Sequence, residues 1–286
     1  MSGVQREYMD RLFCFIFGSE EHKDWTLSLY NAVNGTSYEN PDDIQITTLT
    51  EVVYMGMHND VAFLITDEIN MFEQQSTFNP NMPLRLMQYT SNIYKKLITF
   101  WQKNKYGKTL IRLPVPKLVV FYNGTKDEPD ERILSLSDAF AEEKRDDADI
   151  TVRVRMININ TGKSPDIVSA CKPLVEYTWL VGRVRDCEKT MELDTAVDIA
   201  LDEMPESFLI KTYLEANRLE VKKMLLTEYN EAKTMEMFKE EGREEGQSRL
   251  SALIARLISQ GRISDIEKVV SDSAFRDRMY EEFSKS

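Results

Sequence analysis

The sequence predicts an α/β protein whose first part contains the strands and whose C-terminal part is all helical. Short apolar, partly β-branched runs predict strands at 61–65, 69–76, 117–122 and 151–159. From residue 164 onward, apolar residues recur at helical spacing. We therefore expect three parts, namely a core over 1–163, a helical extension packed on it over 164–242, and a C-terminal helical segment over 243–286.

Composition restricts the class of protein. With 286 residues, 42% of them hydrophobic and 29% charged, the chain is long enough for one large or two modest globular domains. No segment has the length and apolarity of a membrane span, and the N-terminus lacks a signal pattern, so we expect a cytoplasmic protein. Its 3 irregularly spaced cysteines fit reduced, buried thiols. The net charge of −12 argues against a general nucleic-acid-coating protein but leaves room for a local basic surface.

Ahead of residue 60 the chain predicts two helices and a strand. Helical periodicity covers 4–17, and a second helix covers about 24–33 before the turn Asn34-Gly35. The Thr-, Val- and Ile-rich stretch 44–57 predicts a strand, in which Glu51 is a spare candidate acid.

Residues 60–76 carry the pattern on which the functional hypothesis depends. Two extended runs flank Thr66-Asp67, which predicts a β-hairpin with that dipeptide as its loop. In this register Asp60 lies directly opposite Glu73, and Gln75 shares their face of the sheet. The face is apolar towards the loop, so we do not expect it to be wholly solvated. A register shifted by one residue would place Asp60 and Glu73 on opposite faces.

Two carboxylates at one place on a sheet favour a cation between them, because their repulsion is then relieved. A hard divalent ion such as Mg²⁺ takes carboxylate and carbonyl oxygens and completes its shell with water and a substrate phosphate. Such an ion can activate water for displacement at phosphorus. With 2 histidines in the chain, His-dependent triads are poorly supplied. The alternative is a polar hairpin end whose two acids face solvent.

A long basic stretch follows the paired acids. Residues 74–126 include no Asp or Glu, and their cations are Arg85, Lys95, Lys96, Lys103, Lys105, Lys108, Arg112, Lys117 and Lys126. The helix predicted from about Pro83 to Lys103 is expected to bury Leu84, Met87, Tyr94, Leu97 and Trp101. The residues expected to contact nucleic-acid phosphates are Arg85, Lys95, Lys96 and Lys103. An ordinary basic helix, or a patch that pairs with the acidic remainder of the protein, is the alternative.

The rest of the chain becomes progressively helical. An acidic, loop-rich stretch with a short helix at 134–142 precedes the strand 151–159, which we expect towards a sheet edge. Helices are predicted at 166–185, 192–202, 205–242, 251–260 and 264–283, with the last two broken at Gly261. The glycine-interrupted segment 240–246 is either a bent helix or a linker. An apolar stripe over 250–258 predicts packing on a partner helix, and hence a homo-oligomer, such as a dimer, formed through the C-terminal helices.

The order of these elements and motifs resembles a known family. Asp60 on one strand, Glu73-Gln-Gln-Ser76 on the next, and Asn79-Pro-Asn-Met-Pro-Leu-Arg85 before a helix are similar to the Rpn (recombination-promoting nuclease) family, a transposase-like branch of the PD-(D/E)XK nucleases. The strand ending Val120-Phe-Tyr-Asn-Gly124 and the segment 240–246 resemble further landmarks. The resemblance implies a restriction-endonuclease-like mixed sheet flanked by helices. It also implies DNA cleavage dependent on Mg²⁺, or on Mn²⁺ or Ca²⁺, in a bacterial cytoplasm and linked to recombination.

Carried over by position, the resemblance implies a catalytic set of Asp60, Glu73, Gln75 and Glu7. The metal would be bound by Asp60, Glu73 and a backbone carbonyl near Gln74. Gln75 occupies the position where classical members carry Lys, so it would orient water by hydrogen bonds rather than accept a proton. Glu7, in preference to Asp10, would hold a second ion or a water.

The sequence also departs from the family pattern. Asn59 precedes Asp60 where Pro is usual, Gln74 stands where His is usual, and Gln75 carries no amine. These differences leave two alternatives open. One is a catalytically weak or inactive nuclease-fold scaffold that acts as an oligomeric interaction protein. The other is a nucleic-acid binder that does not cleave.

Overall fold

The computed structural model describes residues 12–46 and 60–284. The predictions for Glu7, Asp10, Glu51 and Asn59 fall outside the described residues. The chain divides into two compact units, Met1–Asn230 and Glu231–Ser286.

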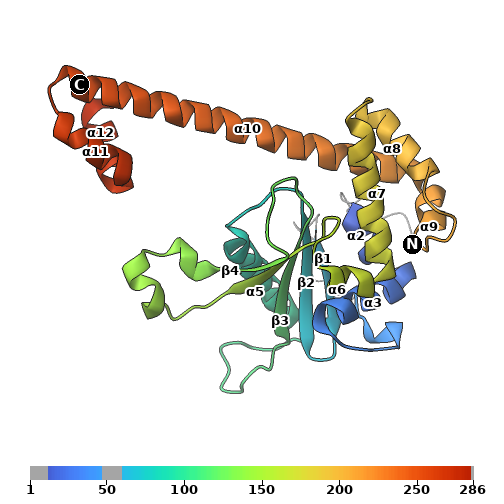
Figure 1. Cartoon of the computed structure of the whole chain (residues 1–286). Helices are drawn as coiled ribbons and strands as arrows, with labels where there is room; N and C mark the ends of the chain where they lie inside the picture. The colour runs from blue at the N-terminus through green and yellow to red at the C-terminus, as the bar shows by residue number, and fades with distance from the viewer. Residues whose placement is uncertain (1–11, 47–59, 285–286) are drawn as a thin grey trace. The chain divides into compact units, whose positions relative to one another are not determined.

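The first unit is built on one sheet with strand order β1-β2-β3-β5-β4 (Figure 1). The strands are β1 Asp60–Ile65, β2 Glu68–Gln75, β3 Val115–Tyr122, β4 Glu131–Ser135 and β5 Arg153–Asn158. Strands β2, β3 and β5 run parallel, whereas β1 and β4 pair antiparallel at the two edges. This arrangement confirms the predicted α/β class with a strand-containing first part.

Helices flank both faces of the sheet (Figure 1). The α-helices of this unit are α2 Leu12–Phe17, α3 Lys23–Asn34, α5 Met82–Phe100, α6 Pro165–Ala170, α7 Lys172–Glu188, α8 Leu193–Asp202 and α9 Lys211–Ala216, followed by the start of α10 Arg218–Ser259. Short 3₁₀ helices lie at Glu20–His22, Pro41–Asp43, Leu136–Ala139 and Glu142–Asp147. Helix α5 covers one face, and α2, α3 and α7 contribute to a larger core on the other.

The β1–β2 hairpin has the predicted register. Asp60 pairs with Glu73, and Ile65 pairs with Glu68 across the loop Thr66-Asp67. Because side chains alternate between faces, Ile69 and Met71 pack in the α5-side core. Phe72 packs in the core on the opposite face. Both faces of β2 are therefore covered, and every residue from Ile69 to Gln75 is buried.

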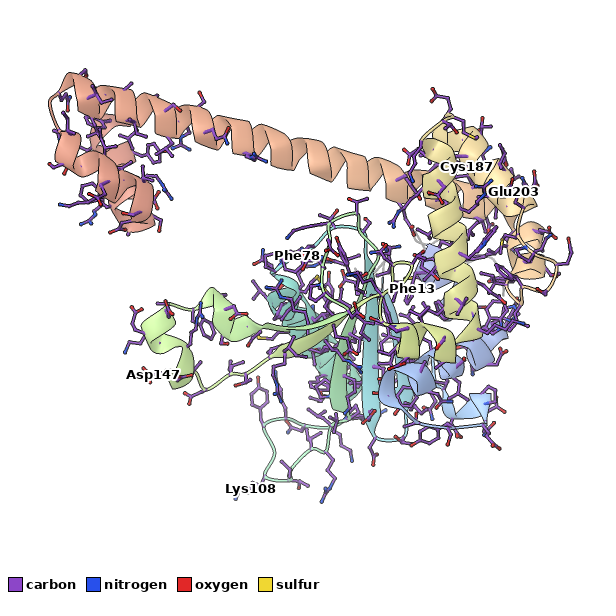
Figure 2. The ribbon with its side chains drawn as sticks, in the orientation of Figure 1. Phe13, Phe78, Lys108, Asp147, Cys187 and Glu203 are labelled. Carbon is purple, nitrogen blue, oxygen red and sulfur yellow. The ribbon has the colours of Figure 1, made fainter. Side chains whose placement is uncertain are left out.

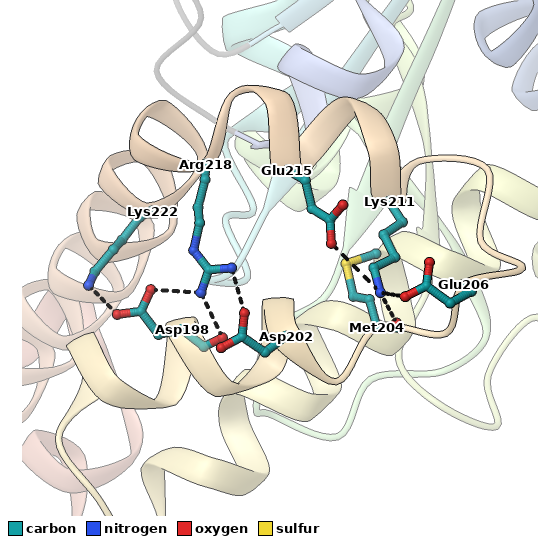
Figure 3. Close-up of polar contacts among 8 residues, drawn as sticks. All are labelled: Asp198, Asp202, Met204, Glu206, Lys211, Glu215, Arg218 and Lys222. Carbon is teal, nitrogen blue, oxygen red and sulfur yellow. Dashed lines mark hydrogen bonds and ion pairs between the residues drawn. The ribbon is translucent and has the colours of Figure 1, made fainter.

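Ion pairs attach the start of α10 to α8 (Figure 3). Arg218 contacts Asp202 Oδ1 at 2.6 Å and Asp198 Oδ1 at 3.1 Å. Lys222 contacts Asp198 Oδ2 at 2.5 Å. The buried Lys211 donates to the Met204 carbonyl at 2.8 Å, which holds the start of α9. The helical residues from 164 to 230 thus pack as part of the first unit.

The buried face of α5 differs from the predicted one. Leu84, expected to be buried, is 41% exposed, and the buried row is Met82, Leu86, Ile93 and Leu97. These residues follow one another at steps of four and seven, so they form one stripe along the helix. Leu84 lies well away from that stripe because each residue turns the helix by about 100°. Arg85 and Tyr89 therefore border the sheet instead of facing away from it.

Three further sequence predictions are wrong. Residues 131–135 form strand β4, and only a 3₁₀ helix follows it, where a helix over 134–142 was expected. Strand β5 is internal, because β4 pairs along its outer side. The helix predicted over 205–242 is divided, since α9 ends at Ala216 and α10 begins at Arg218.

The second unit contains the end of α10, then α11 Ile263–Ser271 and α12 Ser273–Ser284. Its small core consists of Leu253, Leu257, Val269 and Met279. The predicted break at Gly261 is confirmed, since this glycine has φ 73° and ends α10 in the left-handed conformation. Helix α10 runs through 240–246, so that segment is helix rather than linker. Within the described residues, no helix combines the length and apolarity needed to cross a membrane.

Candidate functional site

The buried carboxylate of Glu73 is the centre of the candidate site. It lies near the end of β2 on the face that α5 covers, and it is 2% exposed. Arg85 Nη2 lies 2.9 Å from Glu73 Oε1. The Gln75 side-chain amide donates to the same oxygen at 2.8 Å. A buried carboxylate is costly without a partner, so this pair of donors explains why the strand tolerates Glu73.

Arg85 reaches Glu73 because α5 begins beside the end of β2. Pro83 lies at the start of this helix, which places Arg85 in its first turn. The guanidinium is held from several sides, with Nη2 3.3 Å from the Tyr89 hydroxyl and Nη1 3.6 Å from the Met82 sulfur. Its side chain remains 35% exposed. A cation is therefore already placed between Glu73 and solvent.

Asp60 is described by its backbone, and its side chain lies outside the described residues. The backbone register pairs it with Glu73. Residues paired across an antiparallel ladder share a face, so the backbone places the first strand residue on the Glu73 side of the sheet. Within the described residues, no group of three or more His, Cys, Asp and Glu is placed to hold a metal ion. The predicted acid on the first helix, Glu7, falls outside these residues.

The donor groups at this place fit a hard divalent ion. Glu73 offers carboxylate oxygens, Gln75 offers an amide oxygen, and both lie on one face of β2. Oxygen donors of this kind are the ligands that Mg²⁺ prefers. With Asp60 opposite Glu73 in the register, the residues present fit an ion bound between the two strands. Such an ion would share Glu73 with Arg85 or displace it.

Gln74 points to the opposite face and belongs to a different network. Its amide donates to Asn123 Oδ1 at 2.6 Å, and Asn123 Nδ2 donates to the Tyr177 hydroxyl at 3.1 Å. Arg185 on α7 donates to the Asn123 carbonyl and, at 2.9 Å, to Asn160 Oδ1. The Gln74 side chain is thus used in joining the sheet to α7, so only its backbone carbonyl can serve the site assigned from the resemblance.

A basic and aromatic cluster lies at the same end of the sheet. Lys126 and Arg132 each lie 5.2 Å from the Phe78 ring centroid (Figure 2 labels Phe78). Both also pair with the buried Glu128, at 2.8 and 3.3 Å. Gly124 is required nearby, since a Cβ there would lie 2.3 Å from the Ser76 carbonyl oxygen. Arg132 was not among the predicted phosphate-binding residues because it lies outside residues 74–126, the stretch that contains no Asp or Glu.

The predicted phosphate-binding cations do not form one surface. Arg85 pairs with Glu73, and Lys96 is half-buried, where burial lowers its pKa. Lys95 and Lys103 are exposed and line a cleft at the opposite end of α5. The structure therefore brings Arg85 to the candidate site and separates it from Lys95 and Lys103.

Comparison of the chain with protein-family models, with curated proteins and with solved structures finds no match. Fold and site geometry are therefore what support a functional assignment.

Proposed function

We propose that this protein is a divalent-metal-dependent DNA endonuclease with a restriction-endonuclease-like fold, of the recombination-promoting type. The observation that carries the proposal is the buried Glu73 carboxylate, opposite Asp60 in the hairpin and beside Gln75. The mixed sheet, in which α5 connects the parallel strands β2 and β3, supports the same proposal. Asp60, Glu73 and a backbone carbonyl near Gln74 would bind Mg²⁺, Mn²⁺ or Ca²⁺.

The protein's own residues have separate roles in this proposal. Gln75 donates its amide N–H to Glu73, which leaves its amide oxygen able to accept a hydrogen bond from the attacking water. The bound ion would supply water activation and charge stabilisation. Arg85, already poised at the carboxylate, would turn to a DNA phosphate once the ion takes its place on Glu73. Lys126 and Arg132 would contact the backbone nearby, and Glu7 would hold a second ion or a water.

Nicking of supercoiled plasmid in Mn²⁺ or Mg²⁺ tests the proposal. We expect Glu73→Gln and Asp60→Asn to lower the rate by at least about a hundredfold, because each removes a charged ligand. Glu68→Gln is the matched control, since it makes the same change at the other end of β2, where Glu68 pairs with Lys117 at 3.2 Å. Equal nicking by the native protein and all three variants would refute the assignment.

A catalytically inactive, oligomeric scaffold is the second candidate. Two observations favour it, namely the amide rather than amine at Gln75 and the exposed apolar side chains Ile258, Ile263 and Val270 near the C-terminus. Sedimentation equilibrium of the full chain tests this function. We expect a dimer in the native protein and a monomer after Ile263→Asp with Val270→Asp. A monomeric native protein would exclude it.

A further inference from the structure

A second candidate binding site lies at the opposite end of α5 from Glu73. A cleft with a volume of about 930 Å³ opens between α5 from Met87 to Thr99, the following loop and the beginnings of β3 and β5. Of the residues that the structure describes, four cationic side chains line it and no Asp or Glu does; the cations are Lys95, Lys103, Lys105 and Arg153. The cleft reaches along α5 as far as Met87, but Glu73, Gln75 and Arg85 do not line it, so it is distinct from the Glu73 site.

Among the side chains that the structure describes, no carboxylate pairs with the cations of this cleft. Among residues 12–46 and 60–284, none of the four forms an ion pair. By contrast, Lys117 and Lys126, which belong to the stretch 74–126 without Asp or Glu, each pair with a glutamate. The acid that precedes β5 in the chain, Asp149, does not line the cleft. In a chain of net charge −12, this local excess of positive charge favours an anionic ligand.

The walls of the cleft are apolar and aromatic. Met87, Tyr94, Ile98 and Leu118 line it. The Tyr94 hydroxyl donates to the Pro114 carbonyl at 2.7 Å, which fixes the ring as part of the wall. Tyr106, at the mouth, is 86% exposed. Apolar walls with cations at the mouth suit a ligand that combines a flat ring with phosphate groups, since bases stack on aromatic rings and phosphates pair with Lys and Arg.

We propose that this cleft binds the phosphate groups of nucleotides, either as free nucleotides or within a single strand. Lys103, in the loop after α5, and Arg153, at the start of β5, both line the cleft and would hold the phosphates. The ring lies against Tyr94 or Tyr106. The proposal does not depend on the nuclease assignment, because no residue of the Glu73 site takes part.

Fluorescence anisotropy of a fluorescein-labelled single-stranded oligothymidylate, with the full-length protein in EDTA, tests this site. ATP and inorganic triphosphate serve as competitors. The test variant is Lys103→Glu with Arg153→Glu. The matched control is Lys108→Glu with Lys223→Glu, which changes the net charge equally at exposed positions. Lys108 lies on the extended loop after α5 but does not line the cleft (Figure 2).

We expect the cleft variant to bind the oligonucleotide at least about tenfold more weakly, with the control within about twofold of the native protein. Competition by ATP and triphosphate identifies free nucleotides as ligands, whereas binding of the oligonucleotide alone identifies a strand. Equal weakening by both variants, or no saturable binding by the native protein, would overturn the proposal. Glu73→Gln should bind normally, which distinguishes this result from failure of the nuclease assignment.

Discussion

Strand β2 presents adjacent residues to two faces of the sheet, and the two faces use them differently. On the α7 side, the neutral amide of Gln74 is enclosed in a network with Asn123 and Tyr177. On the α5 side, the charged Glu73 meets Gln75 and a partly exposed arginine. The first network joins buried elements and has no charge to neutralise at Gln74. In the second network, the Glu73 carboxylate is separated from solvent by the Arg85 side chain, so a ligand that displaces Arg85 can reach it.

Neighbouring substitutions should separate these two roles most strongly. Glu73→Gln is expected to lower the rate of metal-dependent nicking by at least about a hundredfold, because the charge that holds the ion is lost. Gln74→Met, one residue away, should retain most of the activity because its side chain faces α7. Initial nicking rates at saturating Mn²⁺ measure both. If Gln74→Met proves the more damaging change, the assignment of the two faces is reversed.

Asn123→Ala should affect stability rather than chemistry. It removes the side chain that accepts from Gln74 and donates to Tyr177. We expect a loss of about 2–3 kcal/mol in the free energy of unfolding, since buried polar groups lose their partners. Urea denaturation gives this value. Asn92→Ala, at an exposed position on α5, is the control and should change stability by less than about 0.5 kcal/mol.

Arg85→Gln tests whether the arginine competes with a divalent ion. Without the guanidinium on Glu73, the carboxylate should bind Mn²⁺ more tightly, by about tenfold. The stability in EDTA should fall at the same time, because a buried charge loses its ion pair. Calorimetric titration with Mn²⁺ and thermal unfolding in EDTA measure these effects. Lys95→Gln, on the same helix, should change neither, and unchanged Mn²⁺ affinity in Arg85→Gln would exclude competition.

The hydrogen bond between Tyr30 and Glu68, at the other end of β2, should have a smaller effect on stability, which is confined to alkaline pH. The Tyr30 hydroxyl donates to Glu68 Oε2 at 3.0 Å. Burial, and then this hydrogen bond, raise the pKa of Tyr30 from 10.0 to about 12. The folded state therefore favours the neutral phenol, and its contribution to stability is present below about pH 10 and lost as pH rises through about 12. Unfolding of the native protein should show this loss. Tyr30→Phe should show a smaller loss, since burial also raises the pKa values of Tyr94, Tyr122 and Tyr229.

The sequence was sufficient to predict the register of the hairpin but not which side chains of α5 pack against it. A two-residue loop between an apolar run and an alternating run determines the pairing of Asp60 with Glu73, because register follows from local spacing. The partner of Arg85 depends on the rotation of α5 about its axis, which is set by packing against the whole sheet. Leu84 shows the difficulty, since an apolar residue at helical spacing is exposed. Strand β4 was missed because two charged residues begin its short run, Glu131 and Arg132.

The loop Thr66-Asp67 has a consequence for the residues at the far end of the hairpin. Its length determines every cross-strand pair, up to Asp60 and Glu73, about 17 Å away. A pairing shifted by one residue would place Asp60 and Glu73 on opposite faces, although every residue of the candidate site would be unaltered. The Thr66 backbone, at φ 52°, adopts the left-handed conformation that such a tight connection demands. A turn far from the candidate site therefore determines that Asp60 and Glu73 lie opposite one another.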